Sequence, residues 1–157
     1  MKTNHLGINI ESANEIIDQL NGLLSAYQIH YQNLRGLHWN IKGRDFFELH
    51  VKYEEYYNDA QVKIDEVAER ILTMGGAPLH SFRDYINNSQ IPAGVDISDG
   101  NKGVSLIANS LEKLLSIEKE IMAKANENKD DGTADLMTQF ISQQEKELWM
   151  LRSWLNM

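Results

Sequence analysis

Cysteine is absent from the sequence, so neither a disulfide nor a metal site built from thiolates can form. Proline is nearly absent, with Pro78 and Pro92 the only two, and helical structure therefore meets few interruptions. No apolar run is long enough to span a bilayer, and no basic segment followed by an apolar one opens the chain. These absences predict a soluble, cytoplasmic protein with no membrane partner.

Basic side chains are also scarce. The sequence holds 15 Lys and Arg against 23 Asp and Glu, a formal net charge of -8. After Lys2 the next basic residue is Arg35, so the first helix starts without a basic tail. Such a surface repels nucleic-acid phosphates and suits the attraction of cations. DNA binding through an N-terminal tail is therefore not expected.

Apolar residues recur at steps of three or four, which is typical of helices packed in a bundle. Four long helices are predicted from this spacing, with their apolar stripes running over residues 16–37, 46–74, 104–122 and 136–155. Residues 81–88 are expected to form a short extra helix in the long connection between the second and third helices. At 157 residues the chain fits one domain, residues 1–157, with an all-α, four-helix-bundle fold.

Local signals mark where these helices start and stop. Ser12 or Asn14 is the expected cap of the first helix, and Gly43 provides the turn after it. The second helix should stop at residues 75–78, where two glycines precede a proline. The third should fade over residues 126–132.

Two histidines do not fit a plain bundle. His38 ends the first apolar stripe and His50 follows soon after the turn. Because the first two helices should be antiparallel neighbours, these imidazoles should lie close together. A lone histidine in such a place more often caps a helix or forms a hydrogen bond in the core.

The second helix adds carboxylates on one face. His50 and Glu54 are four residues apart, as are Asp65 and Glu69. At roughly 100° per residue, Glu54 and Asp65 fall within about 20° of one line along the helix. The alternative is a solvated face whose carboxylates pair with cations of the same helix, namely Lys52, Lys63 and Arg70.

Helix length divides this set into two half-sites. His50 and Asp65 lie 15 residues apart, hence roughly 22 Å along one helix, and cannot hold the same ion. A two-fold axis across the middle of the helix would bring His50 of one copy to Asp65 and Glu69 of another. Mixed imidazole and carboxylate ligands suit iron, manganese or zinc. A di-iron site within one chain is disfavoured, because no Glu has a His three residues later.

Three segments closely resemble motifs of the Dps family, the ferritin-like mini-ferritins also called DNA-binding proteins from starved cells. They are Leu37-His38-Trp39-Asn40-Ile41-Lys42-Gly43, Phe46-Phe47-Glu48-Leu49-His50 and Ile64-Asp65-Glu66-Val67-Ala68-Glu69-Arg70-Ile71. Residues 130–135 and 148–149 extend the resemblance more weakly towards the end of the chain.

The resemblance implies a site and an activity. His38, His50 and Glu54 match ferroxidase ligands given by one subunit, and Asp65 and Glu69 match those given by its two-fold partner. Members of the family form hollow dodecamers, oxidise Fe(II) with hydrogen peroxide in preference to oxygen, and store ferric mineral, which protects against oxidative damage. The spacing itself requires only a two-fold pair, so the number twelve comes from the resemblance.

Secondary roles also follow from the resemblance. Asp130, Asp131 and Asp135 match acidic residues that line pores for iron, although capping of the fourth helix would equally explain them. Trp39 and Trp149 match tryptophans near the iron site that could quench radicals, although packing is the commoner role.

Two other functions remain open at this point. One is a nucleoid protein that binds DNA and has a secondary iron site, although this chain lacks the lysine-rich N-terminus that such members use. The other is an oligomeric bundle without catalysis. His5, His30 and His80 match no functional position, and Tyr27, Tyr31, Tyr53 and Tyr57 are expected in the core.

Overall fold

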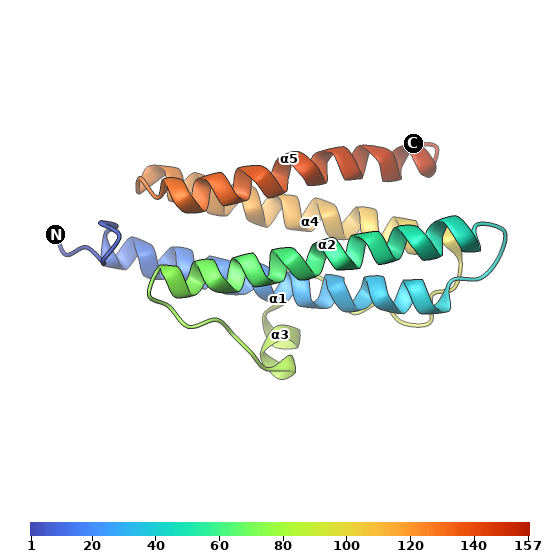
Figure 1. The fold of residues 1–157 in the computed structure, drawn as a ribbon, viewed down its shortest axis with the longest axis horizontal. Helices are drawn as coiled ribbons and strands as arrows, with labels where there is room; N and C mark the ends of the chain where they lie inside the picture. Colours follow the sequence, from blue (N-terminus) through green and yellow to red (C-terminus); the bar gives the residue numbers. More distant parts are fainter.

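The computed structural model describes all 157 residues and contains five helices and no β-strand. The helices are α1 (Ile10–Asn40), α2 (Phe46–Thr73), α3 (Phe82–Asn88), α4 (Gly100–Glu127) and α5 (Asp131–Trp154). Figure 1 shows the antiparallel pair of α1 and α2 beside the pair of α4 and α5, with the short α3 outside the bundle next to α1. The predicted ferritin-like four-helix bundle with a short helix in its long connection is confirmed.

The start of α1 differs from the prediction, whereas the start of α5 agrees with the capping that the sequence offered for its acidic residues. The cap of α1 is Asn9, whose side chain accepts a hydrogen bond from the Ser12 amide at 3.0 Å, rather than Ser12 or Asn14. Helix α5 begins at Asp131, because Asp130 accepts from the Thr133 amide at 3.1 Å and ends the loop there. Several polar residues in each stretch can act as caps. The sequence does not reveal which one the chain uses.

The predicted stops are confirmed. Gly43 adopts a φ of +110° in the turn between α1 and α2, and Gly75 adopts +91° just after α2, values that favour glycine. The amide of Gly76 donates to the Ile71 carbonyl at 2.9 Å and closes the end of α2. The tight turn at Gly43 places the end of α1 beside the start of α2, which positions the two histidines.

Apolar side chains of all four long helices form one core. Tyr27 and Tyr53 are 1% exposed and belong to it as expected, whereas Tyr31 and Tyr57 are only half-buried at its edge. No helix combines the length and the apolarity that crossing a membrane requires.

A polar cluster interrupts the core at its centre. The Tyr27 hydroxyl donates to Glu118 Oε2 at 3.2 Å, and the Gln144 amide donates to the same hydroxyl. Glu118 is fully buried, and burial raises its pKa to about 8. Burial, helped by the nearby Lys63 ammonium, lowers the pKa of His30 to about 4. The core therefore holds a protonated carboxyl group and a neutral imidazole at neutral pH.

Stability should fall as the pH rises from 6.5 to 8. The folded chain keeps the Glu118 proton up to about pH 8, whereas the unfolded chain loses it near pH 4.5. Between these values the folded state binds more protons than the unfolded state. The free energy of unfolding therefore falls as the pH rises, by at most about 1.4 kcal/mol per pH unit. His30 has the opposite effect, but only below its ordinary pKa of 6.5.

Glu118→Gln should therefore remove most of this pH dependence. Burial also raises the pKa of Glu147, which accounts for the remaining slope. Urea unfolding at pH 6.5 and 8 measures the effect, and the exposed Glu120→Gln variant serves as the control. An equal loss of stability in the wild type and in Glu118→Gln would refute the assignment.

Candidate functional site

His38 near the end of α1 and His50 near the start of α2 bind each other's backbone. His38 Nδ1 lies 2.6 Å from the His50 carbonyl oxygen, and His50 Nδ1 lies 2.8 Å from the His38 carbonyl oxygen. A carbonyl oxygen can only accept, so each Nδ1 carries the proton. With the proton on Nδ1, the Nε2 atom of each ring is the one that can offer a lone pair, the form in which histidine binds a metal.

The two imidazoles are stacked. Their centroids lie 3.8 Å apart and their planes differ by 12°. The Phe46 ring also stacks on His50, with centroids 4.9 Å apart. His38 is 8% exposed and His50 is half-buried, so the pair lies at the edge of the core. The expected proximity of the histidines is confirmed, and the backbone bonds fix both rings in place.

Tyr57 connects this pair to a carboxylate. Its ring lies edge-on to His38, with centroids 5.4 Å apart, and its hydroxyl donates to Glu54 Oε1 at 3.2 Å. Sequence reasoning placed Tyr57 in the core and missed this role. The signal was its position three residues after Glu54, which puts both side chains on one face of α2.

Asp65 and Glu69 lie further along α2, exposed to solvent and without an ion pair. The cations that could have neutralised them bind other carboxylates. Lys52 pairs with Glu55 at 2.7 Å, Lys63 pairs with Asp59, and Arg70 pairs with Asp130 at 2.6 Å. The alternative of a face of salt bridges therefore does not describe Asp65 and Glu69, which remain free to bind an ion.

One chain does not bring the two half-sites together. No three His, Asp or Glu side chains lie close enough to hold a metal ion. Asp65 instead borders an open groove of about 790 Å³ between α1 and α2. The outer face of α2 also carries apolar side chains that nothing in the chain covers, namely Phe47, Val51, Val62 and Leu72.

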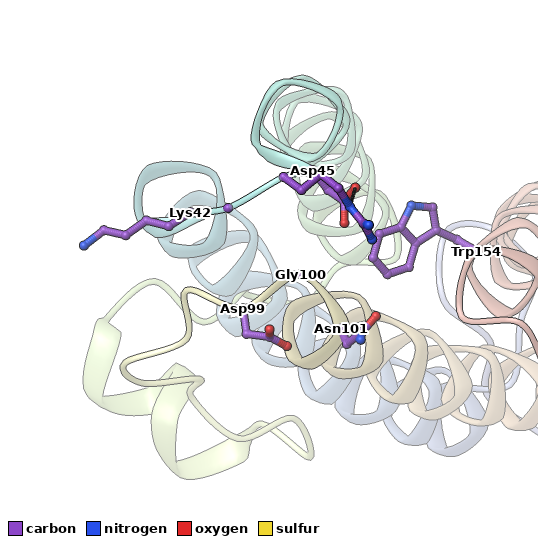
Figure 2. A pocket seen from close by; sticks show the side chains of 8 residues that line it. Lys42, Asp45, Asp99, Gly100, Asn101 and Trp154 are labelled. Carbon is purple, nitrogen blue, oxygen red and sulfur yellow. Dashed lines mark ion pairs between the residues drawn. The ribbon is translucent and has the colours of Figure 1, made fainter.

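A hollow of about 560 Å³ lies at the end of the bundle where α1 turns into α2 (Figure 2). Its acidic side chains are engaged, because Asp99 caps α4 and Asp45 lies 3.8 Å from Arg44 Nε. Lys42 points away from it, and the Trp154 indole donates to Glu48 at 2.9 Å. The hollow contains no histidine and offers no metal site.

Known proteins resemble this chain over most of its length. A sequence model of the ferritin-like domain matches residues 17–157. A DNA protection during starvation protein of Porphyromonas gingivalis is 38% identical over 148 residues, which cover 94% of this chain and 93% of that protein. The chain belongs to the Dps family. An uncharacterized protein of Haemophilus influenzae is 41% identical and covers 98% of this chain and 96% of its own length.

The fold of a solved Dps structure is nearly identical. The crystal structure of a Vibrio cholerae Dps protein superposes with a TM-score of 0.96 at 44% identity, over 99% of this chain and 98% of that one. That protein is described as a member of a broad superfamily of ferritin-like diiron-carboxylate proteins.

The three acidic residues at the start of α5 differ in what they contact. Asp130 is 2% exposed, binds Arg70 and caps the helix, so its carboxylate is already engaged in holding the fold. Asp131 and Asp135 are exposed, and Asp135 accepts from the Gln139 amide at 2.8 Å. The prediction of a pore is therefore kept for Asp131 and Asp135 alone in this Dps chain.

Neither tryptophan named above is packed within the chain. Trp39 and Trp149 are 57% and 62% exposed. The Arg35 guanidinium lies 5.0 Å from the Trp39 ring centroid and 5.2 Å from that of Tyr31. Trp149 lines a shallow groove on α4 and α5. Packing inside one chain therefore does not explain these two residues, and the radical-quenching role stays a prediction.

The residues before α1 lie against the end of α2. His5 Nε2 lies 2.8 Å from the Thr73 carbonyl oxygen, and the Asn4 amide donates to the Met74 carbonyl at 3.4 Å. These bonds satisfy carbonyls that the end of a helix leaves free. His5 is thus structural, and this segment is folded rather than extended from the bundle.

Proposed function

We propose that the chain is a ferroxidase subunit that binds Fe(II) between two copies of itself. One copy provides His38, His50 and Glu54, and its partner provides Asp65 and Glu69. The observation that carries this proposal is the reciprocal pair of Nδ1–carbonyl bonds, which leaves Nε2 as the atom of each ring that can offer a lone pair. The free carboxylates lie roughly 22 Å further along the same helix, so a second copy must provide them.

The chemistry follows from the ligand types. Carboxylates neutralise charge and favour the hard ferric product, while the imidazoles hold Fe(II). A second Fe(II) bound nearby, with Glu69 as the bridge, allows two electrons to pass to one peroxide. Two Fe(II), one hydrogen peroxide and two protons then give two Fe(III) and two waters. This route avoids the one-electron reduction that releases hydroxyl radical.

Storage requires a larger assembly. We propose a hollow dodecamer in which Asp131 and Asp135 line the pores through which Fe(II) reaches the inner surface. The formal net charge of -8 favours this attraction. Ferric product then collects as mineral on acidic side chains of the cavity wall.

Protection of DNA, for which the Porphyromonas gingivalis relative is named, would follow from removing Fe(II) and peroxide together. We do not assign DNA binding to the N-terminal segment. Lys2 is its only basic side chain, and the segment is folded against α2.

Anaerobic mixing of the oligomer with Fe(II) and then hydrogen peroxide tests the proposal. Ferric absorbance should rise rapidly, with about two Fe(II) consumed per peroxide, since each peroxide takes two electrons. A spin trap should capture little hydroxyl radical, and oxygen should react more slowly than peroxide. Radical yields equal to those of protein-free Fe(II) would refute the two-electron mechanism.

Tyr57→Phe should weaken Fe(II) binding by on the order of 10-fold, the cost of losing an outer partner of a metal ligand. The change removes the hydrogen bond that orients Glu54 and keeps the ring against His38. Anaerobic calorimetric titration with Fe(II) measures the affinity of each variant. Tyr56→Phe removes a hydroxyl one residue earlier on α2 and serves as the control. Equal affinities for the two variants would exclude an orienting role for Tyr57.

A further inference from the structure

Arg35 is the one Lys or Arg of α1 and α2 that binds no carboxylate. Helix α1 contains no other, and those of α2 are all paired with carboxylates, namely Lys52, Lys63 and Arg70. Arg35 is half-buried between two aromatic rings, with its guanidinium carbon 5.2 Å from the Tyr31 centroid and 5.0 Å from the Trp39 centroid. Cation–π attraction to both rings holds the guanidinium in place. Neither ring neutralises it, so a fixed positive charge remains on this side of α1.

This charge lies beside the candidate iron site. Arg35 is three residues before His38, so both side chains occupy one side of α1. The Tyr31 ring that it contacts lies edge-on to Tyr57, with centroids 6.0 Å apart, and the Tyr57 hydroxyl donates to Glu54. Partial burial and this hydrogen bond raise the pKa of Tyr57, while the Arg35 charge acts in the opposite direction. The guanidinium thus acts on the hydroxyl that binds the Glu54 carboxylate.

The charges of the proposed site explain what this guanidinium does. The ligands of one site carry three negative charges, from Glu54 of one copy and from Asp65 and Glu69 of its partner. The imidazoles add no charge in the form that binds a metal. With Arg35 present, a single Fe(II) brings the formal charge of the site to zero. Without Arg35, the site would keep one negative charge after the first ion and would attract a second.

We propose that Arg35 sets the number of Fe(II) ions that the site between copies holds, because its positive charge allows one ion to bind tightly and weakens the binding of a second. This inference rests on the proposed function, since it concerns the same site. A guanidinium is always protonated, so its charge does not change with pH. A pair of iron ions therefore forms only at higher Fe(II) concentrations, and each site holds a single ion when iron is scarce.

Arg35→Gln should tighten the binding of the second Fe(II) by roughly 10-fold or more, because a unit charge close to a divalent ion repels it strongly at an interface. Anaerobic equilibrium dialysis of the assembled protein measures the number of ions bound per chain. At a free Fe(II) concentration that gives the wild type about one ion per chain, the variant should hold about two, since each subunit pair has two sites. A weakened fold cannot explain a gain in affinity.

Further variants separate the place of the charge from its loss. Arg35→Lys keeps a positive charge at this place and should bind Fe(II) as the wild type does. Arg44→Gln removes a guanidinium from the turn between α1 and α2, where the Arg44 side chain is 94% exposed, and should also bind as the wild type does. Light scattering checks assembly. If Arg35→Gln does not assemble, Arg35→Met keeps an apolar stem between the two rings without the charge and should show the same gain.

The gain should disappear in an Asp65→Ala, Glu69→Ala background, because this background lacks the partner's ligands. Arg35→Gln with the wild-type number of bound ions, or a gain that persists in this background, would overturn the role of Arg35. Failure of the proposed function gives a different result. If the Asp65→Ala, Glu69→Ala variant with Arg35 in place binds as much Fe(II) as the wild type, the site between copies is itself wrong, and the inference is overturned with it.

Discussion

Replacing both Asp65 and Glu69 with alanine should lower the rate of the fast ferroxidation phase by roughly 100-fold or more, since even outer partners of metal ligands cost 10- to 100-fold. Both carboxylates are exposed and have no ion pair, so their removal should change stability by less than about 0.5 kcal/mol. Stopped-flow absorbance after anaerobic Fe(II) and peroxide measures the rate, and light scattering measures assembly.

The control removes the same charge elsewhere. Glu120→Ala with Glu127→Ala deletes two exposed carboxylates of α4 and should leave the fast phase unchanged. If both double variants slow the reaction equally, the effect comes from net charge and not from a metal site.

Mixed oligomers test whether two copies share each site. Chains with His50→Ala lack one half-site, and chains with Asp65→Ala and Glu69→Ala lack the other. Reassembly of equal amounts should restore roughly a quarter of the wild-type fast phase, because half of the pairs are mixed and each mixed pair has one intact site of two. A mixture that stays as inactive as its components would exclude the shared site.

Arg70→Ala should destabilise the fold by about 3–5 kcal/mol, the cost of breaking a buried ion pair. The Arg70 guanidinium binds Asp130 at 2.6 Å and Thr133 Oγ1 at 2.9 Å, and the Asp130 side chain is 1% exposed. The second oxygen of Asp130 already lacks a partner, so loss of Arg70 leaves a buried charge uncompensated. Urea unfolding measures the change.

Arg152→Ala is the matched control for this prediction. Its guanidinium lies 3.9 Å from Glu112, and the two side chains are 46% and 54% exposed. An exposed pair of this kind is worth about 0–1 kcal/mol. If the two variants lose similar amounts of unfolding free energy, the burial of Asp130 does not determine how much the loss of Arg70 destabilises the fold.

Much of the fold could be predicted from the sequence, because apolar residues at helical spacing must face a common core. The helix stops were also predictable, since Gly43 and Gly75 adopt conformations that few other residues tolerate. The start of α1 was not, because Asn9, Ser12 and Asn14 can all cap and only the folded segment before α1 selects Asn9.

The site was predictable in part for a similar reason. A short turn between antiparallel helices fixes which residues face each other, so the proximity of His38 and His50 followed from their distances to Gly43. The sequence did not reveal that Nδ1 of each ring carries a proton. That assignment depends on two backbone carbonyls, and only the folded turn sets their directions. The role of Tyr57 was missed because aromatic residues on a stripe usually belong to the core.

The sequence by itself determined the helices and the separation of the two half-sites, because helical rise is fixed and a distance along one helix follows from residue numbers alone. Only the tertiary structure decided the partners of charged side chains. Lys63 turns into the bundle and Arg70 reaches α5, which leaves Asp65 and Glu69 without a cation. The physical reason is that a long side chain can pair with any acceptor within its reach, and packing between helices selects which one.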